Sequence, residues 1–129
     1  MNTTIYASTS GQGPDVLLLH GLFGQGSNLR GIARGLEAEF RVHCLDLPDH
    51  GRSLWLDEAS LTHYARAIVL WMSESDISSA HIVGHSLGGK VAMQLALSHA
   101  SLVNRLVVAD IAPAAYAGQH SEVFDALQQ

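Results

Sequence analysis

The chain has 129 residues, of which 47% are hydrophobic and 15% charged, and its seven basic and twelve acidic residues give a net charge of −5. This length suits a single domain with one core, and the acidic balance argues against nucleic acid or an anionic membrane as a partner, since a basic surface binds both. The single cysteine, Cys44, excludes an internal disulfide and a thiolate zinc cluster, and its apolar neighbours predict a buried, inert thiol.

Short apolar runs alternate with longer helical patterns along the chain. The runs at 15–20, 41–47, 79–85 and 104–110 have the length and composition of buried strands. The segments at 27–40, 60–75 and 87–100 have apolar residues at helical spacing, with Ser27 as the expected N-cap of the first. The last of these is apolar nearly all round, as expected of a helix buried under a sheet. The pattern predicts an α/β fold whose mostly parallel sheet is covered by helices on both faces, with residues 3–9 as a further edge strand.

The opening residues and the apolar runs bear on location. The opening residues, MNTTIYASTSG, have neither the basic nor the apolar region of a signal peptide. The longest apolar runs, such as 67–71, are far shorter than a membrane span. We therefore expect a cytoplasmic protein with no membrane partner.

One motif indicates nucleophilic chemistry. In HIVGHSLGGK (81–90), Ser86 stands between Gly84 and Gly88, directly after a predicted strand and before a predicted helix. A nucleophile in such a turn has strained backbone geometry, and the glycines remove side chains that would collide. The turn would also direct the first amides of the helix toward the serine. The alternative is an ordinary turn serine that caps the helix. The placement favours a nucleophile elbow.

A second loop fits an oxyanion hole. Acyl transfer needs two donors for the carbonyl oxygen as it gains charge. The amide of Leu87 would supply one, and HGLFG (20–24), which follows an earlier strand, would supply the other through Leu22. Phe23 would then face the acyl pocket. On its own, HGLFG is equally consistent with a plain glycine-rich turn.

Together these motifs resemble the α/β-hydrolase superfamily and, more closely, its YbfF-like esterases. The likeness is carried by HGLFGQGSNL (20–29), LDLPDHGRS (45–53), GHSLGGKVAM (84–93) and VADIAP (108–113). The resemblance implies hydrolysis of short- to medium-chain acyl esters through an acyl-enzyme, without a metal or organic cofactor. The small-molecule ester would be the partner.

Site residues follow from the resemblance by position. Ser86 would be the nucleophile, with Leu22 and Leu87 as oxyanion donors. Residues of the substrate pocket would be His20, Gly21, Phe23 and His85. Asp110 would be the catalytic acid, although an aspartate there is also a common way to end a strand. Asp46, Asp49 and Arg52 could suggest a metal or phosphate site, but the resemblance implies a structural loop near the active site, braced by Asp46 and Arg52.

The catalytic histidine is missing from this pattern. It should follow the acid, and His120, the only histidine after Asp110, lies in a polar stretch with no strand before it. His43, His50, His63, His81 and His99 occupy strand, loop or helix positions. Whole α/β-hydrolases are roughly twice as long. We therefore expect residues 1–129 to be the N-terminal part of one hydrolase domain, with 1–110 as core and 111–129 as the start of the cap.

Two consequences and two alternatives remain. An enzyme that lacks one member of its triad retains a rate enhancement of only roughly 10³–10⁴ over the reaction in water. The strand at 104–109 would be an unprotected apolar edge that invites self-association. The same scaffold could instead cleave thioesters or carbon–carbon bonds, whereas dehalogenases and epoxide hydrolases need a carboxylate where Ser86 stands. A truncated, non-catalytic binding protein is the remaining alternative.

Overall fold

The computed structural model of the protein describes residues 5–20, 29–47 and 60–109. In these ranges the strands are β1 (Ala7–Ser10), β2 (Asp15–Leu19), β3 (Arg41–Leu45), β4 (Ala80–His85) and β5 (Val103–Ala109). The helices are α1 (Arg30–Leu36), α2 (Leu61–Glu74) and α3 (Leu87–Ser98), and a 3-10 helix, η2 (Ala100–Leu102), leads from α3 into β5. The predicted alternation of strands and helices is confirmed.

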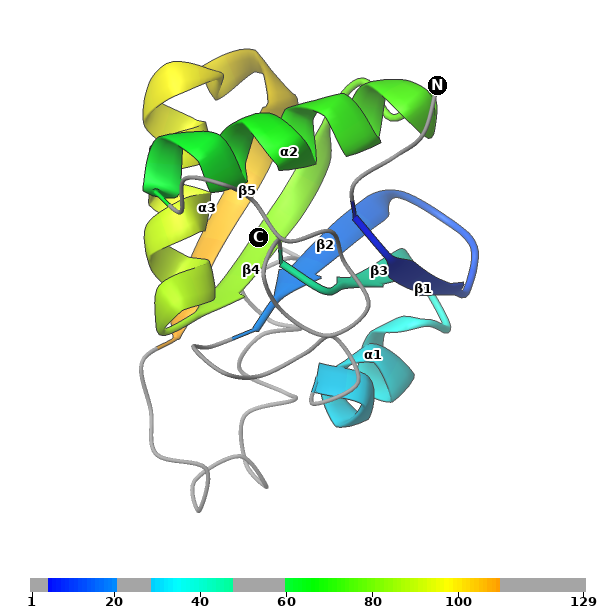
Figure 1. Ribbon diagram of the computed structural model, residues 1–129. Helices are drawn as coiled ribbons and strands as arrows, with labels where there is room; N and C mark the ends of the chain where they lie inside the picture. The colour runs from blue at the N-terminus through cyan, green and yellow to red at the C-terminus, as the bar shows by residue number, and fades with distance from the viewer. Residues whose placement is uncertain (1–4, 21–28, 48–59, 110–129) are drawn as a thin grey trace.

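The five strands form one sheet in the order β1-β3-β2-β4-β5 (Figure 1). β2 pairs in parallel with β3 and β4, and β4 pairs in parallel with β5. β1 runs antiparallel to β3. The mostly parallel sheet and the additional edge strand are therefore confirmed, and the edge strand begins at Ala7 rather than at residue 3. The carboxyl ends of the four parallel strands share one end of the sheet.

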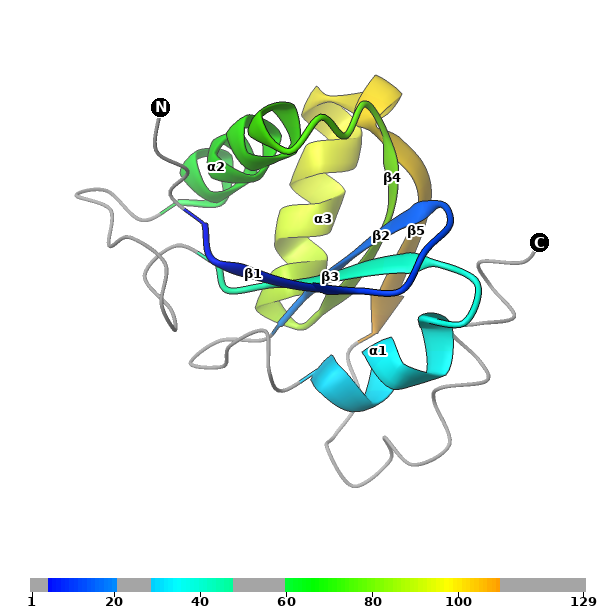
Figure 2. The same cartoon turned by 90° about the vertical axis from the view of Figure 1, so that its right-hand side faces the viewer.

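Helices cover both faces of the sheet, as predicted (Figure 2). Along β2, Leu17 and Leu19 belong to the core under α2 and α3, whereas Val16 and Leu18 belong to the core against α1. All four are fully buried. Because both faces of a parallel strand are covered, its sequence is a continuous apolar run rather than an alternating one.

The first two helices form within the segments that the sequence predicts, and each buries one side. α1 is shorter than the predicted segment 27–40, but its stripe is buried: Leu29, Ile32, Ala33 and Leu36. Ser27, its expected N-cap, lies outside the described residues. α2 begins after Ser60, whose hydroxyl oxygen accepts the backbone N–H of His63 at 3.1 Å. This cap satisfies an amide that the helix leaves free.

The predicted packing of α3 on the sheet is confirmed, but its apolar residues are not all buried. Met93 and Leu97 are 43% and 84% exposed on its outer side. α3 packs against α2, β4 and β5, and among the described residues no α-helix other than α2 shares this face of the sheet. Composition alone could not show this, because the burial of an apolar residue depends on what packs beside it.

The two edges of the sheet differ in kind. β1 has four residues, Ala-Ser-Thr-Ser. β5 has seven, and Leu106 and Val108 on it are 38% and 44% exposed. Short, polar edge strands resist pairing with other chains, whereas long apolar ones promote it. The predicted apolar edge is thus present at the end of the described sheet.

Candidate active site at the carboxyl end of the sheet

Ser86 occupies the turn between β4 and α3 with a backbone conformation that L-residues rarely adopt. Its φ of 56° and ψ of −114° mirror an extended conformation. Among the described non-glycine residues, only Asp76 shares a positive φ. Such strain costs on the order of 1–3 kcal/mol and persists only where the surrounding structure imposes it. The sharp, strained turn expected of a nucleophile elbow is present.

Two glycines allow this turn by letting backbones approach closely. A Cβ at Gly84 would lie 2.3 Å from the Gly88 carbonyl oxygen. A Cβ at Gly88 would lie 2.2 Å from the carbonyl oxygen of Leu19 and 2.7 Å from that of His20. No side chain fits at these distances. The prediction that both glycines avoid collisions is confirmed, and the first turn of α3 rests directly on the end of β2.

The Ser86 hydroxyl is not used to cap α3. Ser86 is the N-cap residue, but its side chain makes no cap hydrogen bond, and its carbonyl oxygen accepts the Lys90 amide at 3.1 Å. The interpretation of Ser86 as a plain capping serine therefore lacks the bond that defines it. Leu87, the predicted oxyanion donor, is the first residue of α3, where backbone amides carry the positive end of the helix dipole.

The predicted oxyanion loop starts beside the elbow. Leu19 of β2 pairs with Gly84 of β4, so the two strands end next to each other. His20 follows β2 and is only 1% exposed, and its Nε2 accepts the Leu47 backbone N–H at 2.9 Å. This bond ties the start of the loop to Leu47, two residues after β3, a link that the sequence did not predict. Gly21, Leu22 and Phe23 lie outside the described residues.

The other predicted residues belong to the same end of the sheet or to segments that follow it. His85 ends β4, is partly exposed and adjoins Ser86. In the register of β4 and β5 it pairs with Ala109. Asp46 is 5% exposed, and its backbone N–H donates to the Tyr6 carbonyl oxygen at 2.9 Å. The remaining predicted residues lie outside the described residues: Asp110, His120, Asp49 and Arg52.

The described part of the chain holds its remaining histidines elsewhere. His43 lies within β3, His63 in the first turn of α2, His81 near the start of β4, and His99 just after α3. His81 packs its ring edge-to-face on Phe40, and burial, with a smaller contribution from the charge of Arg105, lowers its pKa. The strand positions of His43 and His81 and the helix position of His63 are confirmed, whereas His99 lies just beyond α3 rather than inside the predicted helical segment 87–100, and His50 lies outside the described residues.

The thiol and the candidate metal ligands are the other reactive groups to consider. Cys44 is buried as predicted, and burial raises the pKa of its thiol to about 11, which keeps it protonated and unreactive. Residues 5–20, 29–47 and 60–109 contain no group of three or more His, Cys, Asp or Glu side chains that could hold a metal. Within the same ranges no helix is long and apolar enough to cross a membrane.

Comparison with known proteins places these features in context. A family model described as alpha/beta hydrolase fold matches residues 14–128. A pimeloyl-[acyl-carrier protein] methyl ester esterase of Vibrio vulnificus is 41% identical over 113 residues, which cover 88% of this chain and 43% of that protein. An sn-1-specific diacylglycerol lipase ABHD11 of Xenopus tropicalis is 41% identical over 108 residues, covering 82% of this chain and 34% of that protein.

Solved structures give the same picture. A marine microorganism esterase is similar with a TM-score of 0.82 and 32% identity, over 99% of this chain and 52% of that one. A single-residue mutant of a meta-cleavage product hydrolase, CumD, is similar with a TM-score of 0.73 and 30% identity, over 79% of this chain and 40% of that one. The chain spans less than half the length of the two curated relatives described above.

Proposed function

Because the chain belongs to the α/β-hydrolase family, we propose that it carries the nucleophile part of a serine ester hydrolase. The observation that carries this proposal is the turn at Ser86. Its backbone is strained, Gly84 and Gly88 stand where a Cβ would collide with backbone atoms, and the Ser86 side chain makes no cap hydrogen bond. A turn that served only to connect β4 to α3 would need none of these features. Strain of this kind is typical of residues that do chemistry.

The reaction would proceed through an acyl-enzyme. Ser86 Oγ would form a bond to the ester carbonyl carbon while a general base takes its proton. The amides of Leu22 and Leu87 would stabilise the negative oxygen, each contributing roughly 10²–10³ in rate. The alcohol would leave with the proton, and water would then release the acid. Asp110 would orient the base, a histidine that neither the sequence nor the described residues identify.

Pocket residues would decide which acyl groups fit. In this proposal Gly21, Phe23, His20 and His85 surround the acyl chain, with His20 held in place by its bond to Leu47. The names of the relatives, a methyl ester esterase and a diacylglycerol lipase, support carboxylic esters as the substrate class. Short- to medium-chain acyl esters are our specific proposal, with no metal or organic cofactor. The single buried thiol of Cys44 fits a cytoplasmic enzyme.

A second candidate is cleavage of a carbon–carbon bond. The likeness to a meta-cleavage product hydrolase at 30% identity favours it. Both reactions use a serine elbow, so residues near Ser86 do not separate them; thioester cleavage stands on the same footing. A panel of esters, thioesters and diketone-like substrates would distinguish these activities.

Chemical rescue tests the proposal with the 129-residue chain itself. The wild type and Ser86→Ala are incubated with p-nitrophenyl acetate, butyrate and octanoate, with and without added imidazole as a substitute base. We expect cleavage by the wild type to exceed that by Ser86→Ala, and imidazole to widen the difference. Equal rates for folded wild type and Ser86→Ala under every condition would favour a non-catalytic binding protein. Circular dichroism checks folding.

A further inference from the structure

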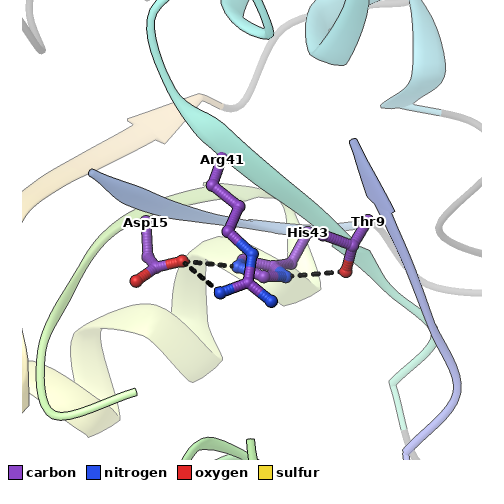
Figure 3. A network of polar contacts seen from close by, with 4 residues as sticks. All are labelled: Thr9, Asp15, Arg41 and His43. Atoms are coloured by element: carbon purple, nitrogen blue, oxygen red, sulfur yellow. Dashed lines mark hydrogen bonds and ion pairs between the residues drawn. The ribbon is translucent and has the colours of Figure 1, made fainter. Parts of the chain in front are cut away.

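Three side chains from three strands form a polar chain that runs from Thr9 on β1 across the middle of β3 to the amino end of β2 (Figure 3). The Thr9 hydroxyl on β1 lies 2.8 Å from His43 Nδ1 on β3, and His43 Nε2 lies 2.8 Å from Asp15 Oδ1 on β2. Arg41 reaches the same carboxylate oxygen at 3.9 Å. The bonds connect β1 to β2 across the strand between them. Asp15 begins β2, whereas Ser86 follows the carboxyl end of β4, so the chain lies apart from the elbow.

The sequence of hydroxyl, imidazole and carboxylate is that of a catalytic triad, but the surroundings are structural. Thr9 lies within a regular edge strand and pairs with His43 in the strand register. The His43 ring is only 1% exposed and packs edge-to-face on Trp71 of α2, with centroids 5.2 Å apart. Neither backbone strain nor the N-terminus of a helix accompanies Thr9 in the described residues. A nucleophile needs such supports for its oxyanion.

The bonds define the protonation state of His43 at neutral pH. An ionised carboxylate only accepts hydrogen bonds, so Nε2 carries a proton and donates it to Asp15. Burial lowers the pKa of His43 below its usual value of 6.5, against the raising effects of the Asp15 bond and charge and with a further lowering by Arg41. The ring is therefore neutral, and its Nδ1 accepts a hydrogen bond from the Thr9 hydroxyl. The contact with Asp15 is a hydrogen bond rather than an ion pair.

From this geometry we propose that Thr9, His43 and Asp15 form a pH-sensitive lock that fastens β1 to the sheet. The charged groups that act on the ring are Asp15 from β2 and Arg41 from β3; β1 and α2 present the uncharged Thr9 and Trp71. Protonation places a positive charge on a buried ring, a cost that the neighbouring Asp15 carboxylate offsets in part and that the charge of Arg41 increases slightly. Detachment of β1 removes Thr9 from the ring and lets water reach it, which relieves that cost.

The sign of the effect follows from linkage. The closed state binds the proton more weakly than the open or unfolded state, so closure is fully stable above about pH 6.5 and weakens as the pH falls through the lower pKa of the closed state. Within that window the opening constant of β1 rises by up to about tenfold per pH unit. Below the closed-state pKa the effect levels off.

Hydrogen exchange of the 129-residue chain tests this lock. The amide of Asp46 reports on β1 directly, because it donates to the Tyr6 carbonyl oxygen just before β1. Its opening constant, corrected for intrinsic exchange, is measured by NMR between pH 7.5 and 5. We expect it to rise as the pH falls below about 6.5, together with those of amides in the β1–β3 ladder.

Three variants make the outcome decisive. His43→Gln should make the opening constant independent of pH in this window, whereas His99→Gln, which alters a histidine bonded to its neighbour Ser98, should leave the dependence intact. Asp15→Asn removes a charge that favours protonation and should increase the acid sensitivity, which gives a test even where His43→Gln does not fold. A flat profile, tighter closure in acid, or an unchanged profile in His43→Gln would overturn the proposal. The readout does not depend on ester hydrolysis.

Discussion

Two hydroxyl groups, one within the edge strand β1 and one in the turn after β4, have contrasting surroundings. Thr9 has an imidazole and a carboxylate at triad distances, but it lies in a relaxed strand. Ser86 has no base identified among the described residues, but it lies in a strained turn at the start of a helix, against glycines that no other residue could replace. The difference teaches that side-chain connectivity alone does not identify a nucleophile. Backbone strain and nearby helix amides are the more informative signs.

The largest expected effect is a loss of stability when a side chain is added at Gly88, where the elbow packs against β2. In Gly88→Val the new Cβ would lie 2.2 Å from the Leu19 carbonyl oxygen, a backbone atom that cannot move aside. We expect a loss of at least about 3 kcal/mol in the free energy of unfolding, or no folded protein. Gly31→Ala, at an exposed position inside α1, is the matched control and should stabilise the chain by roughly 0.5–1 kcal/mol. Denaturant unfolding measures both, and equal effects would contradict the account.

Ser86→Gly should stabilise the protein. Glycine adopts the φ of 56° without the steric cost that serine bears there, and no cap hydrogen bond is lost. Relief of about 1–3 kcal/mol of strain, less the greater flexibility of unfolded glycine, leaves an expected gain of about 1 kcal/mol. A rise in the denaturant midpoint, with abolished Ser86 reactivity, would support a trade of stability for function. A clear loss of stability would indicate that the turn is not strained.

Thr9→Val should destabilise the protein, in contrast to Ser86→Gly. Valine has nearly the same shape and suits a strand, so the change removes mainly the hydroxyl bond to His43. The expected cost is about 1 kcal/mol, measured by the same unfolding experiment. If Thr9→Val stabilised the chain and Ser86→Gly destabilised it, the assignment of the two hydroxyls would be reversed.

How much could be predicted from the sequence depends on how local each feature is. The elbow was predictable because Gly84, Ser86 and Gly88 are close in sequence and their placement between strand and helix is readable from apolar patterns. The strands were predictable because both faces are buried. The lock was not, because Thr9, Asp15 and His43 are brought together only by the pairing of β3 with both β1 and β2. The one signal of the lock in the sequence was His43, a polar residue in the middle of the apolar strand pattern of RVHCLDL (41–47).

Burial on the outer side of α3 was predicted less well. The apolar composition of α3 correctly indicated a helix on the sheet, but the exposure of Leu97 depends on the absence of a described neighbour. The catalytic histidine remained unidentified for a related reason. The position of a catalytic histidine relative to Ser86 depends on the order of the strands and not on a local motif. The spacing of histidines along the sequence therefore does not identify it.

The smallest expected effect concerns the edges. We propose that β5 pairs with β5 of a second copy, since Leu106 is exposed on a seven-residue edge strand. Leu106→Lys should shift the 129-residue chain toward monomer in size-exclusion chromatography with light scattering, because a charge opposes strand pairing. Tyr6→Lys, at 41% exposure beside the opposite edge, is the control. A wild-type chain that is monomeric at high concentration would show that this edge does not self-associate.

The most direct measurement is labelling with a fluorophosphonate, followed by peptide mass spectrometry to locate the adduct. The reagent reacts with hydroxyls that are activated and supported by oxyanion donors, so it compares Ser86 and Thr9 within one folded chain. The account predicts an adduct on the peptide containing Ser86, loss of it in Ser86→Ala, and none on Thr9. Folded protein that is labelled on Thr9, or not labelled at all, would contradict the claim that the strained elbow holds a reactive nucleophile.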